Sequence, residues 1–170
     1  MKINICAFPK KSIIAEEAIT ADFSDSYSTS IAETQMDPLE IYLLMVNKTP
    51  IWINRLLTLR NKIVKQLGLK DVGNLGSISH FNSVKKQNLI GTRLDIFTIE
   101  SFSQDEMILI QKDKHLDIKI SILKHNNDSM TEIIVSTIVN FHNYLGRLYM
   151  FAITPFHKII VKRLMRNIIT

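Results

Sequence analysis

Four stretches of strand length follow one another in the second half of the chain, and only short polar segments separate them. They run from Leu94 to Phe102, from Met107 to Lys112, from Leu116 to His125 and from Thr131 to His142. The separating segments are rich in Ser, Asp, Asn and Lys, which is typical of turns. Parallel neighbours need a crossover of about a dozen residues or more, so these connections predict an antiparallel sheet.

The third and fourth stretches indicate which side chains face the core. Alternation in the third predicts an inward set, Leu116, Ile118, Ile120 and Ile122, and an outward set, Asp117, Lys119 and Ser121. The fourth has Ile133, Val135, Val139 and Phe141 on one face, while Ile134 and Ile138 keep the other face partly apolar. Several polar residues are interpreted as solvated: His115, His125, Glu16, Glu17, Asp105 and Glu106.

The first half of the chain predicts one strand and two helices. Small polar residues alternate with Phe23, Asp25, Tyr27, Thr29 and Ile31, as in a strand with one solvated face. Asp37-Pro38 is a helix start, and that helix should end near Asn47, because Pro50 disfavours helical geometry at the residue before it. A second helix is expected from Pro50 to Gly68, and a short strand at Ile78 to Phe81.

The end of the chain predicts a long helix. Apolar residues recur at helical spacing, namely Phe156, Ile159, Ile160, Leu164, Met165 and Ile168, and the basic residues Lys158, Lys162, Arg163 and Arg166 fall on the other side. The helix either starts at a Thr154 cap or runs from about Leu145 with a kink at Pro155. We favour the kinked helix.

This order of elements predicts an α+β helix-grip fold, in which a curved antiparallel sheet packs on a long C-terminal helix and two short helices follow the first strand. The sequence also resembles the bacterial domain of unknown function family 2867 in Leu145-Gly146-Arg147-Leu148-Tyr149 and Thr154-Pro155-Phe156-His157, as well as in Trp52 and Arg93-Leu94-Asp95. The resemblance implies a fold similar to the START and polyketide-cyclase group. It supplies no catalytic residues, and without a Gly-rich phosphate loop it implies no nicotinamide cofactor.

Length and charge limit the classes of function. We expect an N-terminal arm at residues 1–21 and a single domain at residues 22–170. The lone Cys6 and the absence of a signal-peptide pattern favour a cytoplasmic protein. No apolar segment reaches the roughly 20 residues of a spanning helix. The net charge of +5 is dispersed, so we expect no specific nucleic-acid partner, but a weak contact with an anionic surface or a second copy fits it.

Five residues are the candidates for a ligand site, and no catalytic residue is assigned. Trp52 and Tyr149 are expected to supply apolar walls, and Arg60, Arg147 or His157 to orient the polar end of a ligand. The five histidines lack metal-ligand spacing, so neither a metal nor another cofactor is expected.

Three functions remain open at this point. The first, which we favour, is a noncatalytic domain that binds a small hydrophobic or amphipathic molecule between sheet and helix. The second is an enzyme of the cyclase or dehydratase kind, in which His157 and a tyrosine do acid-base work on a carbonyl compound. The third is a protein- or membrane-surface interaction module with a filled core.

Overall fold

The computed structural model describes residues 2–56, 58, 89–127 and 129–169. The helices and strands in chain order are β1 (Asn4–Ile5), α1 (Ala15–Thr20), β2 (Phe23–Ala32), α2 (Pro38–Asn47), β3 (Arg93–Leu94), β4 (Phe97–Phe102), β5 (Glu106–Lys112), β6 (Leu116–Asn127), β7 (Met130–Phe141) and α4 (Tyr144–Ile169).

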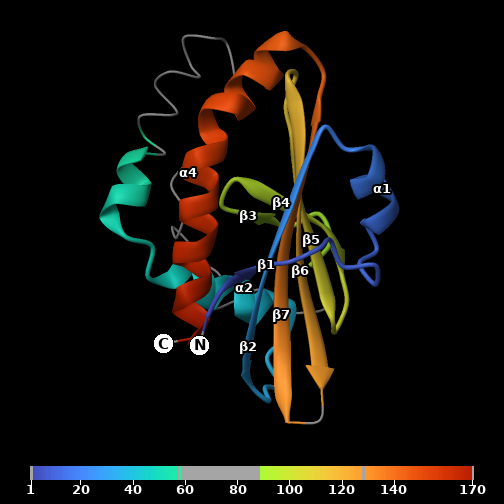
Figure 1. Ribbon diagram of the computed structural model, residues 1–170, viewed down its shortest axis with the longest axis vertical. Helices are drawn as coiled ribbons and strands as arrows, with labels where there is room; N and C mark the ends of the chain where they lie inside the picture. The colour runs from blue at the N-terminus through green and yellow to red at the C-terminus, as the bar shows by residue number, and fades with distance from the viewer. Residues whose placement is uncertain (1, 57, 59–88, 128, 170) are drawn as a thin grey trace.

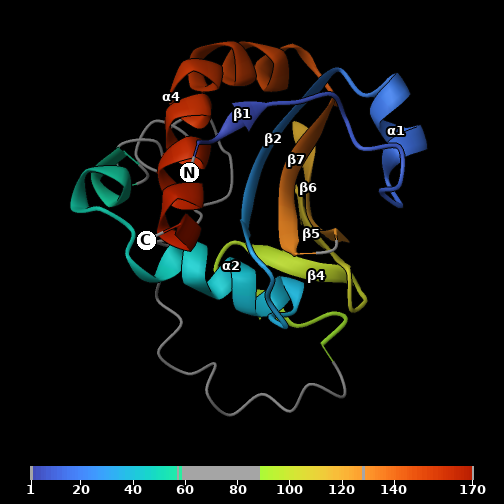
Figure 2. The ribbon, with the colours of Figure 1, turned by 60° about the horizontal axis from the view of Figure 1, so that its bottom comes forward.

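Within the described residues, seven strands form one curved antiparallel sheet in the order β1-β2-β7-β6-β5-β4-β3. Figures 1 and 2 show α2 and α4 on its inner side and α1 on its outer side. The predicted α+β helix-grip arrangement is therefore confirmed. The strand predicted from Phe23 is β2, which pairs with β7 and places the first long strand beside the last.

The first predicted stretch, Leu94 to Phe102, is not a single strand. Leu94 ends β3 and pairs with Phe97, the first residue of β4, so the two residues between them form a tight hairpin turn. One of these, Asp95, has φ 52°, in the left-handed region that aspartate tolerates better than most residues. Little in the sequence indicated this reversal, because Asp95 is the one polar residue of the turn and the turn contains neither glycine nor proline.

Local capping explains where α2 begins. The Asp37 side chain accepts a hydrogen bond from the Glu40 amide at 2.9 Å, and the Glu40 side chain accepts one from the Asp37 amide at 2.9 Å. Pro38 occupies the first helical position, where its missing N–H costs nothing. Residues 51–56 are helical, as predicted after Pro50. The rest of that predicted helix, up to Gly68, and the strand predicted at Ile78 to Phe81 lie outside the described residues.

The last helix, α4, is continuous from Tyr144 to Ile169 with Pro155 inside it, so the kinked helix is confirmed and a start at Thr154 is wrong. Proline lacks the N–H of a helical hydrogen bond, which explains the bend of α4 in Figure 2. At the bend, the Thr154 hydroxyl donates to the Met150 carbonyl oxygen at 2.6 Å instead of capping a new helix.

The buried stripe of α4 differs from the predicted one. Met150, Val161, Leu164, Met165 and Ile168 are buried, whereas Phe156 and Ile159 are exposed. On an ideal helix Phe156 lies about 80° around the axis from Leu164, and Ile159 lies about 120° from Met165, so both fall outside the buried apolar row.

Both ends of α4 are fastened to the rest of the fold. At its start, Asn143 accepts a hydrogen bond from the Gly146 amide at 3.2 Å, and Gly146 lies directly against the backbone of His115. At its end, the buried Asn167 side chain donates to the Met45 carbonyl oxygen of α2 at 2.7 Å. These two attachments set the position of α4 over the inner face of the sheet.

His115 was predicted to be solvated, and this is wrong. Its side chain is buried beneath the start of α4, with Nδ1 3.0 Å from the Asn143 side-chain oxygen. The burial results from the helix start that packs on the β5–β6 turn, a contact that strand phase does not reveal. His125 is half-buried and its Nε2 lies 3.5 Å from the Lys11 ammonium group.

The predicted N-terminal arm covers the outer face of the sheet. Ile14 packs there against Ile108 and Ile138, and the arm also buries the Glu106 carboxylate. Glu106 accepts hydrogen bonds from the hydroxyls of Ser12 and Ser121 and from the Ile13 amide. The prediction of a solvated Glu106 is therefore wrong, and Ser121 faces outward as predicted but is buried by the arm.

Replacing Gly146 by alanine is expected to lower the free energy of unfolding by about 1–3 kcal/mol. The new Cβ would clash with the His115 carbonyl oxygen, so the helix or the turn must shift. An unobstructed glycine-to-alanine change inside a helix raises stability by roughly 0.5–1 kcal/mol instead. Urea unfolding measures the difference, with the change of exposed Arg147 to alanine as a near-neutral control. A gain in stability for Gly146→Ala would contradict the contact.

Candidate functional site

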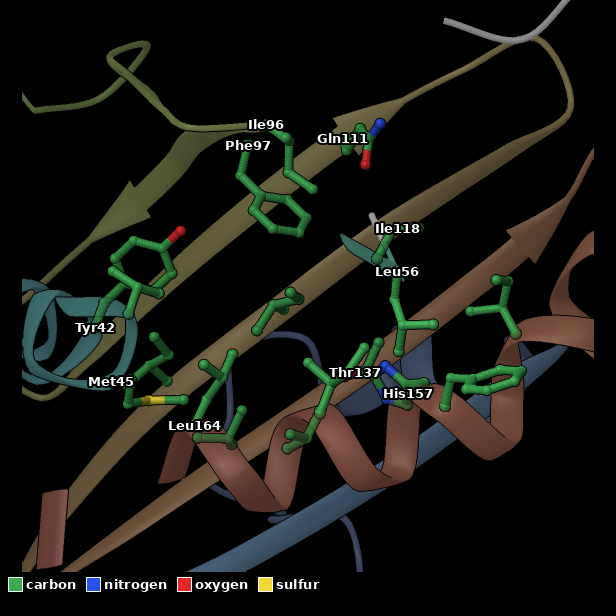
Figure 3. Close-up of a pocket in the computed structure, with 18 of the residues that line it drawn as sticks. Tyr42, Met45, Leu56, Ile96, Phe97, Gln111, Ile118, Thr137, His157 and Leu164 are labelled. Atoms are coloured by element: carbon green, nitrogen blue, oxygen red, sulfur yellow. The ribbon is translucent and has the colours of Figure 1, made fainter. Parts of the chain in front are cut away.

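A cavity of about 350 Å³ lies between the inner face of the sheet and α4, and we call it the pocket. Its lining comes from α2, from four strands and from α4 (Figure 3). The lining residues are Tyr42, Met45, Val46, Leu56, Ile96, Phe97, Gln111, Ile118, Ile120, Ile122, Val135, Thr137, Tyr149, Ala152, Ile153, Phe156, His157, Ile160, Val161 and Leu164.

The inward residues of β6 form much of the pocket floor, as their alternation predicts. Ile122 is fully buried against the core, whereas Ile118 and Ile120 are only half-buried although their strand is central in the sheet. The same is true of Ile160 on α4. These side chains border the pocket, so part of each one is not covered by α4.

His157 lines the pocket and belongs to a chain of three polar side chains that continues behind it to Asp25 and Tyr27. His157 Nε2 lies 3.2 Å from both carboxylate oxygens of Asp25, and the Tyr27 hydroxyl donates to Asp25 Oδ2 at 3.1 Å. The ring of Phe23 meets the His157 ring edge-on, with centroids 6.0 Å apart. Phe23, Asp25 and Tyr27 alternate along β2 and therefore share its inner face.

Burial and the neighbouring Asp25 carboxylate together keep Tyr27 protonated, and the same carboxylate fixes a hydrogen on His157. Burial raises the pKa of Tyr27 well above its ordinary value, and the charge and hydrogen bond of Asp25 raise it further, so Tyr27 is a neutral donor. An ionised carboxylate only accepts hydrogen bonds, so the Nε2 of His157 must carry the hydrogen that points to Asp25. In the neutral imidazole, Nδ1 is then left as an acceptor.

The pocket has further polar groups away from His157. The Tyr42 hydroxyl lies 3.4 Å from Asp95 Oδ2, and burial, followed by the charge and hydrogen bond of Asp95, raises the pKa of Tyr42. Figure 3 shows Gln111 across the pocket from His157, with Thr137 near the histidine. A ligand would thus meet mainly apolar walls with a few separated polar groups, as small-molecule sites commonly have.

The five sequence-predicted site residues have different places in the structure. Tyr149 and His157 line the pocket together. Trp52 is 40% exposed, Arg147 is exposed on α4, and neither belongs to the pocket lining. Arg60 lies outside the described residues.

Sequence reasoning did not identify Asp25, Tyr42, Gln111 or Thr137 as site residues. A signal was present for Asp25, because it falls between Phe23 and Tyr27 on what would be an inward strand face. An acidic side chain on such a face needs a partner. The partner itself, His157, is 132 residues away in the chain, so no local pattern indicates it.

No metal-binding cluster of three or more His, Cys, Asp or Glu side chains is found among the residues that the structure describes. In the same part of the chain, no helix combines the length and apolar content needed to cross a membrane.

One protein family model matches residues 18–164, from α1 to the last part of α4. Its description is protein of unknown function (DUF2867). The pocket-lining residues run from Tyr42 to Leu164 and all fall within the matched range. No curated protein and no solved structure matches the chain.

Tyr27 is expected to stay protonated at pH values where a solvated tyrosine, with a pKa of 10, has already ionised. Its folded-state pKa is raised, so the stability linked to neutral Tyr27 is present below pH 10 and is lost as the pH rises from there toward the folded-state pKa. An NMR titration of isotope-labelled tyrosine rings measures this. Asp25→Asn should lower the Tyr27 pKa only partly, because burial is the larger cause. An ordinary Tyr27 pKa in the unmodified protein would contradict the arrangement.

Proposed function

Since the chain belongs to the DUF2867 family, whose function is unknown, we propose from the pocket that it binds a small, largely apolar molecule between the sheet and α4. The observation that carries this proposal is the open volume of about 350 Å³ over Ile118, Ile120 and Ile160. Water in such a space finds few hydrogen-bond partners, so an apolar ligand that displaces it gains free energy. The volume is at the small end of ligand pockets, which favours a compact or single-chain molecule.

His157 defines the polar end of this ligand. Because Asp25 accepts from Nε2, the group offered by neutral His157 is the acceptor Nδ1. A hydroxyl group satisfies that nitrogen, whereas an ether does not donate and an ionised carboxylate adds charge without a proton to share. The ligand class is therefore an apolar alcohol or phenol.

An enzymatic role is the second candidate, and the Asp25–His157 pair is the observation that favours it. A carboxylate that orients a histidine is the arrangement that a general base requires, and Tyr149 lies in the same pocket. Turnover of a carbonyl compound that is lost in His157→Ala, with binding largely retained, would establish catalysis. A binding domain loses affinity at most. The open pocket weighs against the filled-core interaction module.

The superfamily relationship of the protein and its origin and location in the cell stay predictions. The first is a relationship with the START and polyketide-cyclase group, which the family resemblance implies and with which ligand binding between sheet and helix would agree. The second is a bacterial, cytoplasmic protein, for which the family resemblance gives the bacterial origin and the lone Cys6 favours the cytoplasm.

The neutral dye N-phenylnaphthylamine is expected to bind in the pocket and to fluoresce there. Ile120→Trp should abolish the signal, because the larger side chain fills the space above β6. The matched control is Ile134→Trp, a half-buried position on the outer face of β7, which should leave dye binding unchanged. Equal loss in both variants, or a dye signal that survives Ile120→Trp, would contradict binding in the pocket. Native mass spectrometry of gently purified protein then searches for the natural ligand.

Dodecanol is expected to displace the dye about fivefold better than dodecyl methyl ether does. This ratio corresponds to the free energy of one hydrogen bond, about 1 kcal/mol. His157→Ala should remove this difference while both compounds still compete. Asp25→Asn should reduce it, because an amide no longer fixes the histidine hydrogen at Nε2. Equal displacement by the two compounds in the unmodified protein would contradict the role of His157, even where the dye result supports the pocket.

A further inference from the structure

The solvent-facing side of α4 is apolar over its first four turns. Tyr144, Leu148, Phe151, Phe156 and Ile159 are all exposed, and Tyr144 and Phe151 are exposed by 74% and 81%. We call these five residues the α4 outer face. A surface helix normally turns polar side chains to water, so a row of large apolar ones requires an explanation.

The spacing of these residues makes the row continuous. Steps of three to five residues from Tyr144 to Ile159 would place them within about 140° of one another on an ideal helix. The row passes the bend at Pro155, with Tyr144, Leu148 and Phe151 before it and Phe156 and Ile159 after it. The pocket lining does not include Tyr144, Leu148, Phe151 or Ile159. The proposed ligand therefore does not explain why these side chains are apolar.

The charged residues of α4 itself have a single sign. The sequence of α4 contains Arg147, Lys158, Lys162, Arg163 and Arg166, and it contains no Asp or Glu. Arg147 precedes Phe151 by four residues and Lys158 follows it by seven, so both exposed cations lie on the same side of the helix as Phe151. Apolar side chains flanked by cations are the pattern of helices that lie in the interface of anionic membranes.

We propose that the α4 outer face docks on an anionic lipid bilayer. Phe151, Leu148 and Ile159 enter the boundary between headgroups and acyl chains, while Arg147 and Lys158 contact lipid phosphates. The charge pattern selects this occupant over a second copy of the chain. Two α4 outer faces packed together would oppose cations with cations, and α4 has no acidic residue to compensate them.

Docking in this orientation also brings the pocket to the bilayer. Phe156 belongs to the outer face and to the pocket lining, and the exposed Ala152 also lines the pocket. A bilayer against α4 is thus in contact with the rim of the pocket, where apolar molecules dissolved in lipid have a route into it. The docking itself goes beyond the proposed function and does not depend on it.

Co-sedimentation with vesicles tests the proposal. The full chain is mixed with vesicles of phosphatidylcholine alone or of phosphatidylcholine and phosphatidylglycerol in equal amounts. We expect binding to the anionic vesicles to be at least about tenfold tighter, and to weaken at high salt. Phe151→Ser and Lys158→Glu should each reduce this binding by about tenfold.

Matched controls lie across the sheet. Ile19→Ser changes an equally exposed apolar residue on α1, which lies on the opposite side of the sheet from α4 (Figure 1). Lys10→Glu changes the net charge by the same amount as Lys158→Glu at an exposed position that precedes α1. Both controls should sediment as the unmodified protein does.

The outcomes separate docking from its alternatives. An unmodified protein that stays in the supernatant with anionic vesicles, or controls that lose binding as strongly as Phe151→Ser and Lys158→Glu, would overturn the proposal. A concentration-dependent dimer that dissociates in Phe151→Ser would overturn it in favour of self-association. Dye binding measured without vesicles reports on the pocket separately, so failure of one proposal is distinguished from failure of the other.

Discussion

The attachment of α4 at its two ends is the constraint on which the rest of the structure depends. Gly146 meets the backbone of His115 at the start of the helix, and Asn167 donates to Met45 at its end. Between these points the helix crosses a curved sheet, and a straight contact along its whole length is geometrically excluded because Pro155 bends it. The space that remains is the pocket, so the pocket is a consequence of how the helix is held.

A buried polar chain gives this otherwise apolar space its chemical character. A polar side chain buried in this region costs free energy when it has no hydrogen-bond partner. Asp25 provides that partner for both Tyr27 and His157. The pairing orients the imidazole, and in the neutral form of the ring its second nitrogen is an acceptor. The same geometry serves ligand recognition and general-base chemistry, which is why the two candidate functions share residues and differ in what the bound molecule does.

The last helix also has two apolar sides with different roles. Its inner side, including Met165 and Ile168, is buried in the core, and its outer side, including Phe151, is exposed to solvent. The fold covers only the inner side of α4. Burial of the outer side therefore requires a second apolar medium. For the docking proposed above, the five cations of α4, which contains no acidic residue, favour a medium that carries negative charge.

Sequence patterns determined those parts of the fold that depend on neighbouring residues. Alternation and short turns predicted the antiparallel strands, the Asp37-Pro38 cap predicted α2, and helical spacing through Pro155 predicted a kinked α4. Tyr149 and His157 were identified because they lie in that last helix. Such patterns act through contacts a few residues apart, and these contacts are the same in any fold that contains the segment.

The tertiary structure alone decided what covers each face. The N-terminal arm buries Glu106 on the outer side of the sheet, the start of α4 buries His115, and β2 brings Asp25 to His157. Periodicity indicates that a face is apolar or polar, but the element that packs on it comes from a distant part of the chain. Whether Phe151 points to the core or to solvent depended likewise on the rotation of α4 about its axis, which its two attachments to other elements set.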